Sequence, residues 1–198
     1  MRPLMISPIG EPGSGKSTFS LGLAHALKQA GVHAEFVPEI IKHAVFTPEG
    51  VARVTSGRFD SRYLRLQHAA AKGFWEQAEI VVNDGALEPF YYYGKGRVSA
   101  SQWTDYERLL ERFRQEQSKA EHRFVALDLK LDYHETGRHQ DRSTALAMRG
   151  PLLACLKERY GIEPTVLRSA DDISAYTRSL VREISELRQR PKARAPRP

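Results

Sequence analysis

The stretch Gly10-Glu11-Pro12-Gly13-Ser14-Gly15-Lys16-Ser17-Thr18 decides how the rest of this chain is organised. It fits the pattern G-x-x-x-x-G-K-[ST], in which the backbone N–H groups of a glycine-rich loop curl around phosphate oxygens. An apolar run over residues 4–9 precedes it and predicts a buried parallel strand. Apolar residues at helical spacing follow it as far as Gly31, and they predict a helix whose positive N-terminal end faces the loop.

The end of this loop carries the side chains that distinguish it from an ordinary glycine-rich turn between a strand and a helix, which does not require Lys16 or Ser17. We expect Lys16 to reach the β- and γ-phosphates of a nucleoside triphosphate and the Ser17 hydroxyl to ligate Mg²⁺. ATP and Mg²⁺ are therefore the predicted cofactors. The residues predicted to hold the nucleotide are Gly10, Glu11, Gly13, Ser14, Gly15, Lys16, Ser17 and Thr18.

Length and composition suit a single α/β domain over residues 1–187, because 198 residues can bury a core without metal or disulfide staples. The only cysteine, Cys155, has no partner for an internal disulfide, which favours a reducing, cytoplasmic compartment. Residues 1–3 lead directly into the first strand, so we expect no signal peptide, and no apolar run approaches membrane-spanning length.

The basic character of the chain is concentrated at its C-terminal end. The net charge is +6, yet residues 187–198 hold five basic side chains and no acidic one, which leaves about +1 for the remainder. A segment rich in proline and arginine buries little apolar surface, so we predict a disordered tail over residues 188–198. Such a tail either grips the phosphate backbone of a nucleic acid or serves only to keep the protein soluble.

Strands and helices alternate along the whole chain. Further strands are predicted over residues 33–37, 79–84, 124–129 and 164–167, and the main helices over residues 60–78, 101–120, 143–160 and 171–188. This alternation predicts a five-stranded parallel sheet covered by helices on both faces. Ligands of such sheets bind beyond the carboxyl ends of the strands, which places the glycine-rich loop, Glu39 and Asp84 around one crevice.

A family resemblance adds to this interpretation. No N-K-x-D motif of the GTPases is present, and the chain is too short for the large motor ATPases. It resembles the P-loop nucleoside and nucleotide kinases, and within them the group that contains nicotinamide riboside kinase and the phage kinases of hydroxymethylated pyrimidines in DNA. The matching pieces are residues 10–18, Val37-Pro38-Glu39, Asp84 and Glu135-Thr136-Gly137-Arg138.

The resemblance implies roles for two acids. Glu39 would orient and deprotonate the attacking hydroxyl, unless it is only an acid in the first turn of a helix. Asp84 would bind Mg²⁺ or share the role of base, and Asp128, after the fourth strand, competes for part of that role. The family often has a second acid or an arginine after the aspartate, whereas Gly85 and Ala86 follow here, so the assignment of the base stays open.

The resemblance also implies a kinase lid over residues 132–142. A mobile arginine that closes on the migrating phosphoryl group stabilises its charge, and Arg138 and Arg142 are the candidates for this catalytic role. The alternative is that these arginines make solvated surface ion pairs, for example with Asp141.

Two polar residues lie on otherwise apolar helical arcs. Gln67 lies in the middle of the apolar arc of helix 60–78, where it is either hydrogen-bonded in the core or directed into a pocket. Arg149 shares an arc with leucines of the next-to-last helix, so it requires a buried anion, which the protein or a phosphate supplies. We predict that both residues, with Glu39 and Asp84, contact the substrate.

The sequence leaves several acceptors and one other class of protein open. The basic tail and a stripe of Arg62, Arg65 and Lys72 favour a polyanionic acceptor, specifically 5-hydroxymethyluracil in DNA. A free nucleoside or nucleoside monophosphate is the alternative acceptor, since charges on a helix usually form a solvated face. A nucleotide-gated regulatory protein that transfers no phosphate is the alternative of another class.

Overall fold

The computed structural model describes residues 2–45, 47–55, 61–95, 98–129 and 140–189. Its centre is a five-stranded sheet in the order β2-β3-β1-β4-β5, in which every paired strand is parallel. The strands are β1 (Leu4–Ile9), β2 (Ala34–Val37), β3 (Ile80–Asn83), β4 (Glu121–Leu127) and β5 (Thr165–Leu167). The predicted parallel α/β sheet is confirmed.

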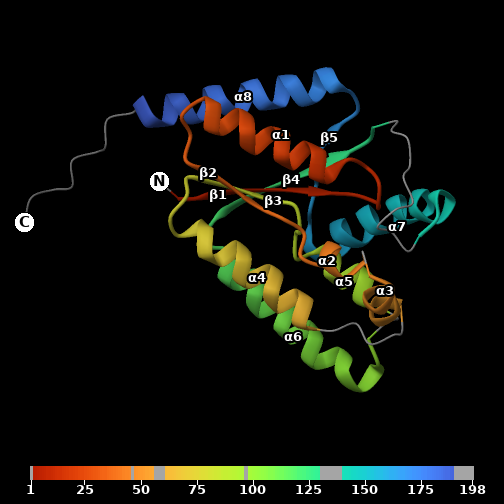
Figure 1. Cartoon of the computed structure of the whole chain (residues 1–198). Helices are drawn as coiled ribbons and strands as arrows, with labels where there is room; N and C mark the ends of the chain where they lie inside the picture. Colours follow the sequence, from red (N-terminus) through yellow and green to blue (C-terminus); the bar gives the residue numbers. More distant parts are fainter. Residues whose placement is uncertain (1, 46, 56–60, 96–97, 130–139, 190–198) are drawn as a thin grey trace, which may run out of the picture.

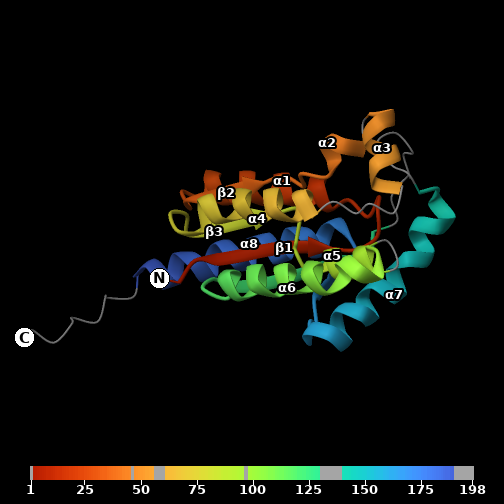
Figure 2. The same ribbon diagram turned by 90° about the horizontal axis from the view of Figure 1, so that it is seen from below.

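Two pairs of helices cover the sheet. Helices α1 (Lys16–Gln29) and α8 (Ala170–Gln189) lie on one face, and α4 (Ser61–Trp75) and α6 (Ala100–Gln117) lie on the other (Figures 1 and 2). Because side chains of a strand alternate between the faces, β1 serves both layers. Leu4 and Ile6 pack in the cluster that includes α1 and α8, whereas Met5 packs with Trp75 of α4.

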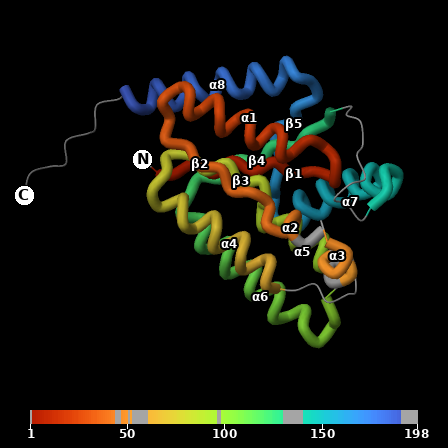
Figure 3. The backbone as a smooth tube through the Cα atoms, in the orientation of Figure 1, coloured from red at the N-terminus to blue at the C-terminus, as the bar shows by residue number. Residues whose placement is uncertain are grey.

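The remaining helices gather at the carboxyl end of the sheet, where the site lies (Figure 3). They are α2 (Lys42–Val45), α3 (Pro48–Thr55), α5 (Pro89–Gly94) and α7 (Arg142–Tyr160). The order of the strands makes β3 the neighbour of both β2 and β1. The segments that follow these three strands therefore lie side by side.

Several predicted boundaries were wrong for identifiable reasons. Strand β4 begins at Glu121 rather than at residue 124, because backbone pairing with β1 extends over the polar residues Glu121–Arg123. Helix α8 continues to Gln189, and Arg188 donates a hydrogen bond to Glu79, so the tail does not begin at residue 188. Residues 190–198 lie outside the described residues.

Among the described helices, none combines the length and the apolar character needed to cross a membrane.

Candidate active site

The glycine-rich loop joins β1 to α1 as the sequence predicts. Gly15 immediately precedes the helix with φ of 88°, a left-handed conformation that side-chain-bearing residues rarely adopt. Inside the loop, the Ser14 hydroxyl donates a hydrogen bond of 3.0 Å to the Glu11 carbonyl. The Lys16 ammonium donates to the carbonyls of Gly10 and Glu11 at 3.0 and 2.8 Å. Its burial lowers the pKa of Lys16, although Glu39 and Asp84 act in the opposite direction.

Both predicted acids lie beside this loop. Asp84 directly follows β3, its side chain is 1% exposed, and its backbone N–H donates to the Val37 carbonyl at 2.9 Å. Glu39 follows β2 by two residues, and its side chain is 26% exposed. Burial raises the pKa of the Glu39 carboxyl, while the nearby Lys16 and Lys42 ammonium groups act against this rise.

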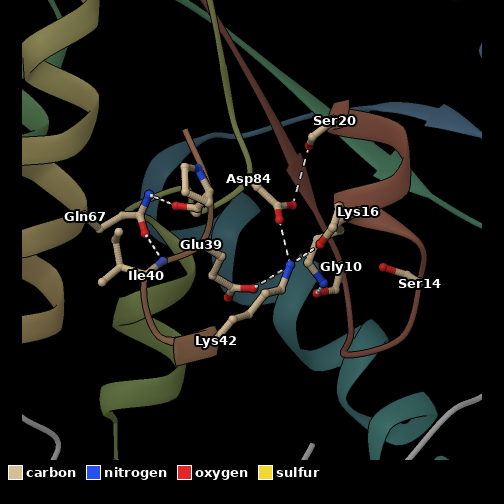
Figure 4. A network of polar contacts seen from close by, with 12 residues as sticks. Gly10, Ser14, Lys16, Ser20, Glu39, Ile40, Lys42, Gln67 and Asp84 are labelled. Atoms are coloured by element: carbon tan, nitrogen blue, oxygen red, sulfur yellow. Dashed lines mark hydrogen bonds and ion pairs between the residues drawn. The ribbon is translucent and has the colours of Figure 1, made fainter. Parts of the chain in front are cut away.

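Lys42 connects these acids to the P-loop, and sequence analysis missed it (Figure 4). Its ammonium lies 2.6 Å from Asp84 Oδ2 and 3.5 Å from Glu39 Oε2, and it donates a hydrogen bond to the Ser17 hydroxyl. Its position three residues after Glu39 was the available signal, because residues so spaced lie together in a helical turn.

Gln67 holds the segment that carries Glu39. Its side-chain oxygen accepts a hydrogen bond of 2.8 Å from the Ile40 N–H, and its amide nitrogen donates to the Pro38 carbonyl and to Asn83 Oδ1, each at 3.1 Å. The side chain is fully buried, so of the two alternatives the hydrogen-bonded core position is observed. Its amide is bonded to both neighbours of Glu39 (Figure 4), and the predicted contact of Gln67 with the substrate stays a prediction.

Gly85 explains the departure from the kinase pattern after Asp84. A Cβ atom at this position would lie 2.4 Å from Cδ of Gln67, well inside van der Waals contact. A residue with a side chain would collide with Gln67 at this position, because the Gln67 amide occupies the space that the side chain would need.

Arg149 has a protein anion as its partner. Its guanidinium lies 2.5 Å from Asp128 Oδ1 and 3.8 Å from Glu11 Oε2, and it also donates to the Leu127 carbonyl. Of the two anions that the sequence left open, the structure shows a protein carboxylate, and the substrate contact of Arg149 stays a prediction. The pairing also places Asp128 in an ion pair, and the competing metal role of Asp128 stays a prediction.

Most of the predicted lid, including Arg138, lies outside the described residues. Arg142 is exposed in the first turn of α7. The preceding Asp141 caps this helix, because its carboxylate accepts a hydrogen bond of 2.7 Å from the Thr144 N–H. Asp141 therefore has a structural role, and the lid role of the two arginines stays a prediction.

A largely apolar groove of about 490 Å³ adjoins the P-loop between α1 and α8. Gly15 and Thr18 form its end beside the phosphate loop, and its lining continues along Gly22 of α1 and over Leu129 and Ile173. Its size and apolar lining suit a planar aromatic ring next to a phosphate site.

The residues beside the P-loop fit Mg²⁺ as it binds with nucleotide phosphates. The Ser17 hydroxyl and the Asp84 carboxylate present hard oxygen atoms. Both accept a hydrogen bond from the Lys42 ammonium, so the two oxygens lie close enough to bind one cation together. Among the described residues no group of three or more His, Cys, Asp or Glu side chains could hold a metal ion alone. Mg²⁺ commonly takes one or two protein ligands and completes its shell with phosphates and water.

Comparison with solved structures shows the fold. NadR in complex with NAD and AMP-PNP superposes with a TM-score of 0.61 at 16% identity, covering 99% of this chain and 52% of that one. NadR in complex with NR gives a TM-score of 0.60 at 15% identity, covering 99% and 54%. The chain thus spans about half the length of these NadR chains. The APS kinase CysC of Mycobacterium tuberculosis with AMPPNP and APS matches at 14% identity with a TM-score of 0.44, covering 93% and 98%.

No protein-family model matches the chain. Comparison with curated proteins finds no match in sequence. The fold of this chain is nonetheless similar to that of the NadR structures over almost its whole length.

The contact between Gly85 and Gln67 predicts a specific double-mutant result. Gly85→Ala should lower the free energy of unfolding by about 1–3 kcal/mol, because the new methyl group collides with a buried side chain. In a Gln67→Ala background the same change should cost much less, since the obstructing amide is gone. Urea denaturation of the four proteins measures the coupling, and equal costs in both backgrounds would contradict the close approach.

Proposed function

We propose that the protein is an ATP- and Mg²⁺-dependent kinase that transfers the γ-phosphoryl group to a hydroxyl of a nucleotide-type acceptor. The observation that carries this proposal is the P-loop flanked by two carboxylates, Glu39 and Asp84. The Asp84 carboxylate and the Ser17 hydroxyl also share one cation partner, the Lys42 ammonium. A nucleotide switch needs no candidate base beside its γ-phosphate site. The P-loop kinase fold and the AMP-PNP bound by NadR support ATP as the donor.

In this proposal each residue has a chemical task. Lys16 leaves its carbonyl partners and binds the phosphates, and the loop N–H groups position them. Glu39 accepts the proton of the acceptor hydroxyl while that oxygen bonds to the γ-phosphorus and the bond to the β-phosphate oxygen breaks, which releases ADP. Ser17 and Asp84 would hold Mg²⁺, which would neutralise charge on the phosphate oxygens.

For the acceptor, we propose 5-hydroxymethyluracil in DNA, supported by the family resemblance and by the basic C-terminal segment. The helical stripe supports it less than the sequence suggests, because Lys72 is 2.9 Å from Glu116 of α6 and so has a protein partner. A free nucleoside or nucleoside monophosphate is the second candidate, supported by the similarity in fold to NadR, which was solved in complex with NR.

The deciding experiment offers γ-labelled ATP and Mg²⁺ with two acceptor pools, hydroxymethyluracil-containing DNA and a mixture of free nucleosides and monophosphates. Label in the DNA would support the proposed acceptor, and label only in the small molecules would replace it with the second candidate. Label in neither pool by a protein that binds ATP would favour the regulatory class. Lys16→Ala is the control that should abolish transfer while circular dichroism shows an intact fold.

Glu39→Gln tests the proposed base with little change of shape. We expect kcat to fall by about 10²–10⁴-fold, because the amide cannot accept the proton, while the Kd for ATP stays within about twofold. Single-turnover transfer and calorimetric binding separate the two effects. An unchanged kcat would remove Glu39 from the mechanism and return Asp84 as the candidate base.

The groove between α1 and α8 predicts where the nucleobase of ATP binds. Gly22→Leu should weaken ATP binding by roughly tenfold by filling the groove, and should leave binding of inorganic triphosphate unchanged. Gly73→Leu in α4 is a matched control, since a Cβ at either glycine meets nothing within 4 Å. Equal ATP affinity of the two variants would place the base elsewhere.

Truncation after Gln189 tests the basic tail and keeps α8 and the Arg188–Glu79 ion pair. If DNA is the acceptor, we expect weaker DNA binding and a smaller salt dependence, because the removed segment contains Arg190, Lys192, Arg194 and Arg197. ATP affinity should not change. DNA affinity that is unaltered at low salt would show that the tail is not a nucleic-acid arm.

A further inference from the structure

Lys42 lies where a divalent cation and an ammonium group cannot both bind. Its ammonium donates hydrogen bonds to the Ser17 hydroxyl and, at 2.6 Å, to Asp84 Oδ2. These are the two protein oxygens that the site offers to Mg²⁺. A magnesium ion binds its oxygen ligands at about 2.0–2.1 Å, so an ion on these oxygens would lie within a few ångströms of the ammonium nitrogen.

The two cations would repel each other strongly at this position. Asp84 is buried, and the repulsion between like charges rises as the local dielectric constant falls. Asp84 also cannot be left alone, because a buried carboxylate without a partner is costly. Asp84 Oδ2 therefore binds either the Lys42 ammonium or a metal ion at any one time.

Lys42 has a second acidic partner to which it can move. Its ammonium lies 3.5 Å from Glu39 Oε2, and the Lys42 side chain is 37% exposed, whereas that of Asp84 is 1% exposed. The lysine can therefore leave Asp84 and keep an ionic contact. The carboxylate is fixed, because its backbone N–H donates to Val37 and its Oδ1 lies 3.5 Å from the Ser20 hydroxyl.

We propose that Lys42 is an internal counter-ion that competes with the divalent cation for Ser17 and Asp84. Its consequence is selectivity for the metal–nucleotide complex. Metal alone must displace the ammonium with only two protein oxygens, whereas metal bound to a nucleotide brings phosphate ligands and pairs Asp84 as the lysine leaves. This inference rests on the proposed function for the identity of the metal site, but not on phosphate transfer.

The test measures metal binding without turnover. Mn²⁺ serves as the probe, and the free ion is counted by its electron paramagnetic resonance signal. Wild-type protein without nucleotide should bind Mn²⁺ weakly. Lys42→Gln removes the charge and keeps a hydrogen-bond donor. It should bind Mn²⁺ at least about tenfold more tightly, because the repulsion between two like charges at close range exceeds the free energy of a tenfold change in affinity. Lys42→Arg should bind as weakly as wild type.

Two controls keep the result interpretable. The gain should disappear in Lys42→Gln/Asp84→Asn, which removes the carboxylate, and thermal unfolding should show that every variant is folded. Lys42→Met replaces Lys42→Gln if the latter does not fold. Equal Mn²⁺ affinity of wild type and the neutral variants, or a gain that survives loss of Asp84, would overturn the proposal.

Binding of Mn²⁺ with AMP-PNP distinguishes this failure from failure of the proposed function. If the wild-type protein binds the metal–nucleotide complex while the Lys42 variants show no gain for free Mn²⁺, the kinase proposal stands and the counter-ion proposal fails. If the wild-type protein binds neither AMP-PNP nor its metal complex, the proposed function fails. A gain in the Lys42 variants would then still establish the competition between the lysine and the metal.

Discussion

The buried negative charge of Asp84 is the constraint on which the site depends. Its carboxylate follows a strand in the interior of a parallel sheet and is almost completely shielded from water. A carboxylate in such surroundings stays charged only if cations and hydrogen-bond donors surround it. Lys42 and Ser20 meet this need directly, and Lys16 adds its charge from the P-loop. The segments that follow β1, β2 and β3 are thus tied together by one charge.

A second constraint fixes the segment that carries Glu39. Two residues after a strand the backbone is no longer held by the sheet, yet the carbonyl of Pro38 and the N–H of Ile40 both bond to the buried Gln67. This arrangement requires the Gln67 amide to pass directly over Gly85. The helix α4, the loop after β3 and the candidate base are therefore one packed unit, and the glycine that departs from the kinase pattern is part of it.

The parts that could be predicted from sequence are those encoded by local pattern. The apolar runs, the loop glycines and the helical periodicity predicted the five strands and the P-loop, and the rules for parallel sheets placed Glu39 and Asp84 at one edge. Lys42 was missed because its spacing of three residues from Glu39 is common in sequences, and its contacts with Ser17 and Asp84 come from other elements of the fold. Gln67 and Arg149 were recognised as unusual, but their partners come from other elements, and only the tertiary structure identifies Asp128 and the backbone of residues 38–40.

The different surroundings of the two carboxylates favour a division of roles that the sequence left open. Asp84 is buried, lies against a cation and shares that cation with the Ser17 hydroxyl, which suits a metal ligand. Glu39 lies nearer the surface than Asp84, and burial raises the pKa of its carboxyl above the ordinary value, which makes it a stronger proton acceptor. When two acids share a site, the difference between their environments usually gives them different chemical roles. The geometry therefore favours Glu39 as the base and Asp84 as the metal ligand, and it gives Lys42 a place between them, where it stabilises both charges.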